Sequence, residues 1–326
     1  MAEYKGIHGT KIQNYTSDPA NPILGQVWYN ETSQTMKVQA VTTAGTWATG
    51  GDLNTARAPL GEAGTQTATL GFGGLISTTA QALTESYDGT SWTEVNDLNT
   101  ARYNFAGAGT QTSALGFGGT TPPLTAVTES WNGTCWTEVN DLNTARRLLG
   151  GTGTNNTASL AFGGYIGPAA TAVTESWNGT CWTEVNDLNS SRYGLAGSGV
   201  ETSALASGGE LNPGNTGATE SWNGTSWTEV NDLNTARYIL AGAGDSNASA
   251  LAFGGNTGGP AVANTELYNG TSWSEQNDLS IARYYLGGAG TTTAGLAFGG
   301  DTGSITAATE EWTGAGSPTT RTITSS

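Results

Sequence analysis

The chain has 326 residues, including 49 glycines, and only 12% of its residues are charged, with 27 acidic against 11 basic side chains and a formal net charge of −16. This acidic balance excludes nucleic-acid binding through the overall field of the protein, because such binding depends on neutralising phosphates. The opening residues lack a charged segment followed by an apolar core, and no apolar run reaches membrane-spanning length. We therefore expect neither a signal peptide nor membrane insertion.

Residues 1–45 differ from the rest of the chain and form a predicted N-terminal attachment segment. Two prolines precede two short strand-like runs, Val27–Asn30 and Met36–Val41, which are joined by a polar turn. The residues Gly25–Asn30 and Thr35–Val38 resemble short N-terminal segments of tail-fibre and other virion proteins of tailed bacteriophages. The resemblance implies a virion location, on a tail or surface appendage, and contacts with other virion proteins through residues 1–45.

The remainder of the chain repeats itself. The stretch "ESWNGTSWTEVNDLNTAR" at Glu220–Arg237 recurs in four other places, nearly letter for letter in three of them. Three features occur six times each: a glycine pair, a tryptophan, and an aspartate in the motif D-L-N. The aspartates follow one another at intervals of 44 to 46 residues, at Asp52, Asp97, Asp141, Asp187, Asp232 and Asp278. Such a period predicts a repeat architecture.

Each repeat contains four segments with the alternation of short strands. In the copy over residues 102–142 these are "RYNFAGAG", "SALGFGG", "AVTESWNG" and "CWTEVNDL". Asn132–Gly133 between the last two predicts a tight hairpin, since both residues tolerate positive φ. Four antiparallel strands repeated six times predict an all-β fold, a six-bladed β-propeller of four-stranded antiparallel blades with a small N-terminal hairpin or extended attachment segment.

The repeat resembles the kelch repeat of the central domain of galactose oxidase-like proteins. The residues that carry the resemblance are Gly118–Gly119, Trp131 and Trp136 with their equivalents over residues 47–316. The resemblance implies the propeller fold and no particular activity. We assign a structural role to the tryptophans Trp47, Trp92, Trp136, Trp182, Trp227 and Trp273. Ser207 stands where five other copies have phenylalanine, so we expect looser packing there.

The ends of the repeated region predict how the ring closes. Its first element, Trp47–Leu53, is a fourth strand, and its last clear one, Ile305–Trp312, is a third strand. The first is therefore expected to complete the last blade. We divide the chain into the attachment segment (residues 1–45), the propeller (residues 46–316) and a C-terminal tail (residues 317–326). Thr319–Ser326 also alternates like a strand and either competes for the open edge or adds to it.

The chemistry of the repeats argues against an enzyme. The only histidine, His8, lies outside them, so a histidine-liganded copper centre or a histidine-dependent triad has no ligands in the propeller. Near-identical repeats supply rings of one residue type, whereas catalysis needs an asymmetric cluster. We expect no catalytic residues, cofactor or metal site. The Asn-Asp pairs of "VNDLN" are turn caps in this interpretation, and Ca²⁺ ligands in the alternative one.

Other repeated residues have structural interpretations. The Arg and Glu rings form either one ion pair in each blade, which we favour, or a polar ring around a pore; they include Arg102, Arg146, Arg192, Arg237, Glu129, Glu175 and Glu220. The Asn-Gly-Thr sequons are explained as hairpins. Cys135 and Cys181 hold equivalent positions 46 residues apart, too distant for a disulfide, and replace serine.

The functional signal lies in the loops that follow the glycine pairs, because they vary on a constant scaffold. Neutral drift is the alternative explanation. In a four-stranded meander these loops share a face with the connections between repeats, while the attachment segment joins on the opposite face. The candidate binding residues are Leu75, Ile76, Pro122, Pro123, Leu124, Tyr165, Ile166, Glu210, Leu211, Asn212, Asn256 and Asp301.

This layout favours non-enzymatic recognition of a host-surface glycan or protein by a multimeric virion component. Two alternatives stay open. One is a purely structural decoration or tail-collar protein, and the other is a cellular kelch-type protein-interaction module.

Overall fold

The computed structural model describes residues 12–19, 25–41, 44–316 and 318–323. All regular secondary structure in these residues is β-strand, and no helix is present there that could cross a membrane. The chain divides into two compact units. One comprises Met1–Gly45 with Gly314–Ser326, and the other comprises Thr46–Thr313.

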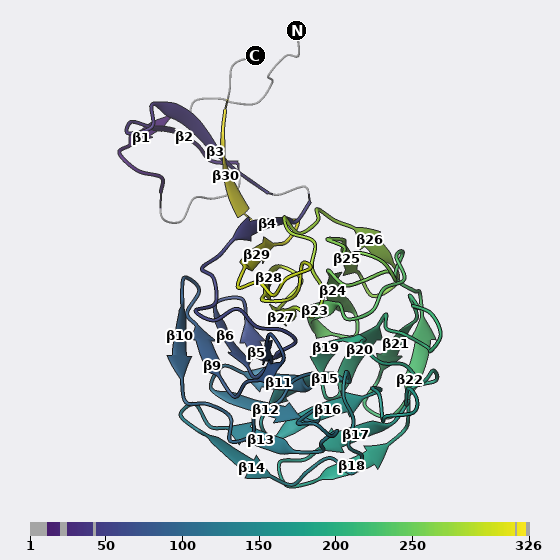
Figure 1. Ribbon diagram of the computed structural model, residues 1–326. Coiled ribbons are helices and arrows are strands. Elements are labelled where there is room, and N and C mark those ends of the chain that lie inside the picture. Colours follow the sequence, from purple (N-terminus) through teal and green to yellow (C-terminus); the bar gives the residue numbers. More distant parts are fainter. Residues whose placement is uncertain (1–11, 20–24, 42–43, 317, 324–326) are drawn as a thin grey trace. The chain divides into compact units, whose positions relative to one another are not determined.

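The larger unit is a six-bladed propeller, which confirms the predicted fold class. Figure 1 shows six antiparallel sheets in a ring, with the first strand of each nearest the centre. The first three blades contain β5 (Gly61–Thr65), β6 (Ala68–Phe72), β9 (Thr84–Tyr87) and β10 (Trp92–Val95); β11 (Ala106–Thr110), β12 (Ser113–Phe117), β13 (Thr128–Trp131) and β14 (Trp136–Val139); and β15 (Gly150–Asn155), β16 (Ala158–Phe162), β17 (Thr174–Trp177) and β18 (Trp182–Val185). The last three contain β19 (Ala196–Val200), β20 (Ser203–Ser207), β21 (Thr219–Trp222) and β22 (Trp227–Val230); β23 (Ala241–Ser246), β24 (Ser249–Phe253), β25 (Thr265–Tyr268) and β26 (Trp273–Glu275); and β27 (Gly287–Gly290), β28 (Ala294–Phe298), β29 (Thr309–Thr313) and β4 (Thr46–Thr49).

The sixth blade is built from both ends of the propeller sequence. Strand β4 pairs antiparallel with β29 and places Trp47 opposite Trp312. The strand is shorter than the predicted Trp47–Leu53, because it ends at Thr49. Leu53 still donates a backbone hydrogen bond to Ala307, at 3.0 Å. The sheet of the last blade is therefore complete only when residues from the beginning of the unit join it.

The first strand of each repeat begins later than the sequence predicts. In the second blade the predicted strand starts at Arg102, whereas β11 starts at Ala106. Two features exclude the intervening residues from the sheet. The side chain of Arg102 is fully buried inside the blade. Asn104 has a φ of 58°, in the left-handed region, which interrupts an extended strand.

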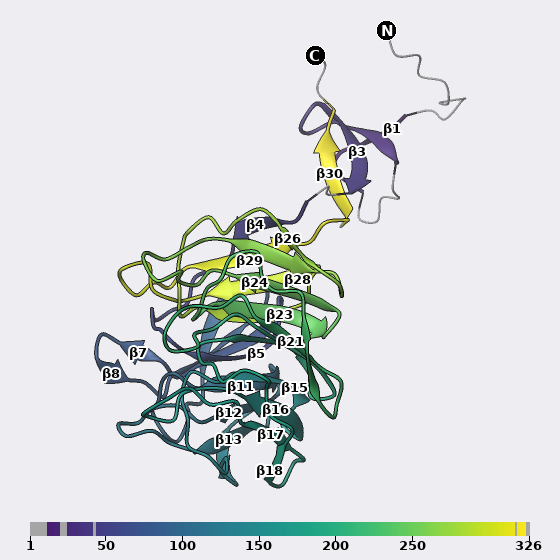
Figure 2. The ribbon, with the colours of Figure 1, turned by 90° about the vertical axis from the view of Figure 1, so that its right-hand side faces the viewer.

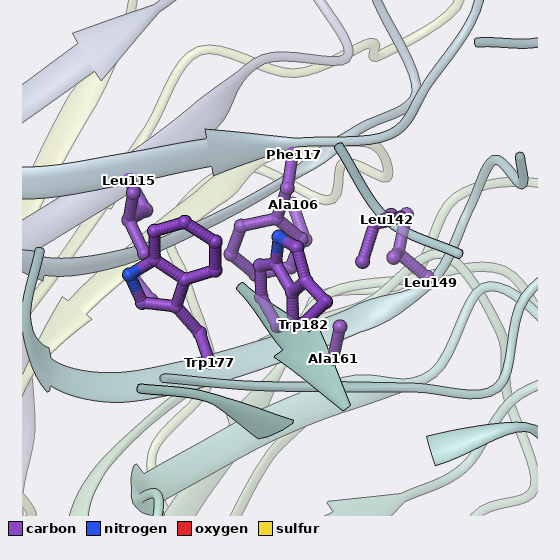
Figure 3. Close-up of a cluster of buried hydrophobic side chains, with 9 residues drawn as sticks. Ala106, Leu115, Phe117, Leu142, Leu149, Ala161, Trp177 and Trp182 are labelled. Carbon is purple, nitrogen blue, oxygen red and sulfur yellow. The ribbon is translucent and has the colours of Figure 1, made fainter. Parts of the chain in front are cut away.

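The hydrophobic core lies in the seams between neighbouring blades. In Figure 3, Trp177 and Trp182 of the third blade face Leu115 and Phe117 of the second. The rings of Phe117 and Trp182 meet edge to face, with centroids 4.9 Å apart. Five seams contain this phenylalanine–tryptophan contact: Phe72–Trp136, Phe117–Trp182, Phe162–Trp227, Phe253–Trp47 and Phe298–Trp92. Each contact joins a second strand to the fourth strand of the next blade.

The seam between the fourth and fifth blades lacks this contact, because Ser207 replaces the phenylalanine. Trp273 is still buried there. The Ser207 hydroxyl and the Trp273 indole N–H are both buried without a hydrogen-bond partner. In the other five seams the indole donates to a threonine hydroxyl of the neighbouring blade, as Trp136 does to Thr84 at 3.1 Å. This seam thus lacks both the aromatic contact and the indole hydrogen bond of the other five.

The smaller unit is a four-stranded sheet. It contains β1 (Gln13–Tyr15), β2 (Val27–Asn30), β3 (Thr35–Val41) and β30 (Pro318–Thr322), in the order β1-β2-β3-β30. The C-terminal strand β30 thus pairs with β3 and adds nothing to the last blade. Within this unit Trp28 is fully buried, and its indole donates to Asp18 at 3.0 Å.

Candidate functional site

One face of the propeller combines the variable loops with the connections between blades; we call it the loop face. Figure 2 shows the ring from its side, with the small hairpin of β7 (Leu75–Ile76) and β8 (Thr79–Ala80) projecting from this face. In every blade, the residue after the glycine pair bridges to the residue after the repeated arginine. The six bridges are Ala58–Leu75, Tyr103–Thr120, Arg147–Tyr165, Tyr193–Glu210, Tyr238–Asn256 and Tyr284–Asp301.

An arc of four peptide hydrogen bonds runs around the propeller axis on the loop face; we call it the collar. Its members are the second residues after each repeated arginine, from the second to the sixth blade. The bonds run from Leu148 N to Asn104 O (2.7 Å), Gly194 N to Leu148 O (2.8 Å), Ile239 N to Gly194 O (2.6 Å) and Tyr285 N to Ile239 O (3.0 Å).

All five collar residues have positive φ, and four of them are not glycine. Residues other than glycine adopt this conformation at an energetic cost, so the surrounding hydrogen bonds must hold it in place. The first blade has Pro59 at the corresponding place, and proline has no N–H to donate. The collar therefore fixes the backbone beneath the bridging residues in five of the six blades.

Beside the collar, seven of the eight bridging residues of the third to sixth blades form an aromatic and charged surface together with the collar residue Tyr285. We call it the central patch; it consists of Arg147, Tyr165, Tyr193, Glu210, Tyr238, Tyr284, Tyr285 and Asp301. The rings of Tyr165 and Tyr193 meet edge to face with centroids 5.2 Å apart. The Arg147 guanidinium lies 5.2 Å from the centroid of the Tyr165 ring, within range of a cation–π contact.

Four tyrosines of the central patch have a raised pKa and are neutral hydrogen-bonding groups at physiological pH; they are Tyr193, Tyr238, Tyr284 and Tyr285. Burial raises the pKa of Tyr193, and a hydrogen bond to Glu210 raises it further. Burial also raises the pKa of Tyr284, with its charged neighbour Asp301 adding to the shift. The pKa of Tyr285 is raised to about 12, again mainly by burial. All patch side chains are partly buried, so they present ring surfaces and polar atoms in fixed positions.

The candidate loop residues from the sequence occupy two different levels of this face. Leu75, Tyr165, Glu210, Asn256 and Asp301 lie at the bases of the loops, in the bridges. The side chains that extend further along the loops are exposed, apart from Leu124, which is partly buried; they are Ile76, Pro122, Pro123, Ile166, Leu211 and Asn212. The variable loops therefore contribute both an inner surface around the axis and an outer rim.

Sequence reasoning missed the other half of the central patch. Arg147, Tyr193, Tyr238 and Tyr284 all follow a repeated arginine directly, and Tyr285 is one residue further on. A sequence pattern could have identified them: the two residues after each repeated arginine differ between the six copies, although the neighbouring residues are nearly constant. The six dipeptides are AP, YN, RL, YG, YI and YY. The strand pattern of the sequence places this dipeptide within the first strand of the repeat, as in "RYNFAGAG". The later strand starts place them on the loop face instead.

The repeated arginines and glutamates form one buried ion pair in each blade, as the favoured interpretation predicts. The pairs are Arg57–Glu85, Arg102–Glu129, Arg146–Glu175, Arg192–Glu220, Arg237–Glu266 and Arg283–Glu310. Burial lowers the pKa of Arg102 to about 10, so the group stays charged at neutral pH. The second oxygen of Glu129 accepts from the backbone and side chain of Asn99. These pairs hold blades together internally and do not line the axis.

The remaining polar residues of the repeat satisfy turns. Asp97 accepts a hydrogen bond from the backbone N–H of Thr84, as the equivalent aspartates do in the other blades. Asn132 caps its hairpin by accepting from the backbone of Cys135 at 2.9 Å. Both cysteines are exposed and free. His8 lies outside the described residues. Within the described part, no three His, Cys, Asp or Glu side chains gather as a metal site.

Comparison of the chain with the models of known protein families and with curated protein sequences finds no match. The propeller and the central patch therefore carry the functional argument by themselves.

Proposed function

We propose that the protein is a non-enzymatic recognition module that binds a surface glycan at the central patch. This proposal rests on one observation: five tyrosines, two carboxylates and one guanidinium lie together near the propeller axis, in a protein whose blades are otherwise nearly identical in sequence. Residues that pack inside and between the blades are the same or similar in all six repeats. The patch departs from that likeness, as expected for residues that meet a ligand.

The chemistry of the patch suits a sugar. A tyrosine ring offers an apolar surface for the C–H face of a pyranose, while its hydroxyl donates and accepts hydrogen bonds at the edge. Glu210 and Asp301 accept from sugar hydroxyls, and Arg147 donates to them. The net charge of −16 disfavours polyanionic ligands, so we propose a neutral or amino-sugar glycan.

We further propose that the blades are kelch-type repeats and that the protein is a tailed-phage virion component. The glycine pairs and regularly spaced tryptophans support the first statement. The residues from Gly25 to Val38 support the second, by their resemblance to virion attachment segments. Display of many copies on a particle would turn weak single-site binding into firm adhesion.

The experiment compares multimerised protein on a glycan array and on candidate host cells. Tyr193→Ala should weaken binding by about tenfold or more, because it removes a ring and a hydroxyl that holds Glu210. Tyr103→Ala is the matched control, since Tyr103 holds the same repeat position outside the patch. We expect it to retain binding.

Equal binding by wild type and Tyr193→Ala would contradict the proposal. Loss of adhesion after changes confined to the Asn-Gly hairpins would move the recognition surface to the opposite face. A propeller that binds no glycan but assembles with virion proteins would have the structural role of a decoration or collar subunit instead.

A further inference from the structure

A single glutamate interrupts the ring of small residues around the propeller axis. Glu62 is the second residue of β5 and lies opposite Gly71 of β6. The corresponding residue in each of the other five inner strands is glycine, at Gly107, Gly151, Gly197, Gly242 and Gly288. Glycine at this position is therefore compatible with packing in five blades, and packing gives no reason for a carboxylate in the first blade.

Glu62 lies at the level of the axis where two cavities meet the same residues. Two cavities of about 90 Å³ and about 110 Å³ lie along the axis, the first beneath the collar and the second beyond it. Both are lined by Glu62, Gly107, Gly151, Gly197 and Gly242. We call this shared level the waist. Glu62 thus borders both cavities, and it alone among these waist residues has a side chain.

The waist is walled by backbone groups that have no partner strand. Each inner strand pairs with only one neighbour, the second strand of its own blade. In the second blade, Gly118 donates its N–H toward Val127 on the side of the third strand. Because strand residues alternate in direction, the peptide groups of Gly116 also point toward the third strand. Those of its partner Gly107 therefore point away from the sheet, into the channel.

The inner strands also approach one another closely at this level. A Cβ atom added to Gly107 would lie 2.2 Å from the carbonyl oxygen of Glu62, and one added to Gly197 would lie 2.5 Å from that of Gly151. Only glycine permits this contact. The result is a ring of carbonyl oxygens around the waist, with one carboxylate among them.

The Glu62 carboxylate has no partner among the residues that the structure describes. No hydrogen bond or ion pair within the described residues involves its oxygens, and no described charge perturbs it. Enclosure by the inner strands raises its pKa to about 8. What surface it exposes faces the channel, since it lines both cavities. A partly buried carboxylate beside two axial cavities, with no described partner, is available to a ligand that supplies positive charge.

We propose that the waist of the channel binds a hard divalent cation, Ca²⁺, through the Glu62 carboxylate, the ring of backbone carbonyl oxygens and water. Ca²⁺ accepts six to eight oxygen ligands of mixed carboxylate, carbonyl and water origin. The cavities are large enough for a hydrated ion, whereas organic ligands need pockets of about 300 Å³ or more. A site with one carboxylate belongs to the weak end of the Ca²⁺ range, with a Kd of about 10⁻⁴–10⁻³ M.

The test is calorimetric titration of the full chain with CaCl₂ at pH 8.5 and constant ionic strength. Glu62→Gln removes the charge at constant shape, and Glu62→Gly restores the residue of the other five blades. We expect one site of the stated affinity in the wild type, with affinity at least about tenfold lower in both variants. Ca²⁺ should raise the Tm of the wild type more than that of either variant.

Surface carboxylates of this acidic chain also bind Ca²⁺ weakly, and the two variants keep all of them. Identical titrations for wild type and Glu62→Gln would therefore overturn the proposal. So would a wild type that binds K⁺ and not Ca²⁺. Glycan binding at the central patch involves other residues, so its failure would leave this result unaffected.

Discussion

The seam between the fourth and fifth blades offers a substitution that should increase stability. Ser207→Phe would supply the ring that the other five seams contain. The walls of its site are already present. Trp273 is buried there. In the preceding seam the Phe162 ring lies 3.0 Å from a Cβ atom added to Gly197, and Gly242 holds the equivalent position in this seam. The side chain is fully buried, so the new ring would leave water completely.

The magnitude follows from three gains and one cost. Burying a phenylalanine contributes about 1.5–3 kcal/mol, and a ring contact with Trp273 adds about 0.5–1.5 kcal/mol. Removing the buried hydroxyl of Ser207, which has no partner, relieves about 1–3 kcal/mol. Accommodating a larger side chain in a packed seam costs about 1–3 kcal/mol. Taken at the middle of each range, the gains exceed the cost by about 3 kcal/mol, which is the net stabilisation that we expect.

The assay is urea-induced unfolding followed by tryptophan fluorescence, with calorimetry for the Tm. The matched control is Phe162→Ser, which creates the Ser207 situation in the adjacent seam and should cost about 3–5 kcal/mol. If Ser207→Phe lowers the free energy of unfolding, the seam is already filled and the reasoning is wrong. A control that costs less than about 1 kcal/mol would show that these rings contribute little to the seams.

Three further predictions concern closure, the buried ion pairs and pH. Deleting residues 1–53 removes β4 and leaves β29 as an open edge strand, so the truncated protein should aggregate. A deletion of residues 1–30 keeps β4 and should stay folded. Equal solubility and Tm for the two truncated proteins would refute closure by β4. Glu129→Gln should lower the free energy of unfolding by about 3–5 kcal/mol in urea titrations, because Arg102 keeps a buried charge without its partner. An unchanged midpoint would contradict this. With a chelator present, the free energy of unfolding should fall between about pH 5 and pH 8. The Glu62 carboxyl has an ordinary pKa of 4.5 in the unfolded chain and ionises there, whereas the folded protein, with a pKa of about 8, keeps it protonated. The fall should be on the order of 4 kcal/mol and absent in Glu62→Gln. A parallel pH profile for the two proteins would disprove it.

The fold could be predicted because the sequence states the same local requirements six times. Each glycine pair, Asn-Gly hairpin and buried tryptophan is a local feature, and its recurrence about every 45 residues leaves a propeller as the natural arrangement. The ion pair between Arg102 and Glu129 was also within reach of the sequence, since two buried opposite charges in every repeat need each other. Closure by β4 followed from which strand the repeated region lacks.

The candidate site could be predicted only in part. Variation after the glycine pairs identified Tyr165, Glu210 and Asp301, because those loops are contiguous in sequence. Tyr193 and Tyr238 belong to a different connection, and their side chains join the loop residues only through bridges across the blade. The left-handed backbone of the collar also lies beyond sequence patterns, since Ile239 is an unusual residue for that conformation.

The number of blades and the four strands of each blade could be read from the sequence, because they depend on local patterns that recur in every repeat. Where the first strands begin, and which aromatic rings meet in the seams, depended on the folded structure. The tertiary structure alone decided what gathers at the axis. There, residues about 45 positions apart meet, and a single departure from the repeat, such as Glu62 among glycines, faces every other blade at once. The central patch and the waist exist because a closed ring brings all six copies of one position to the same place.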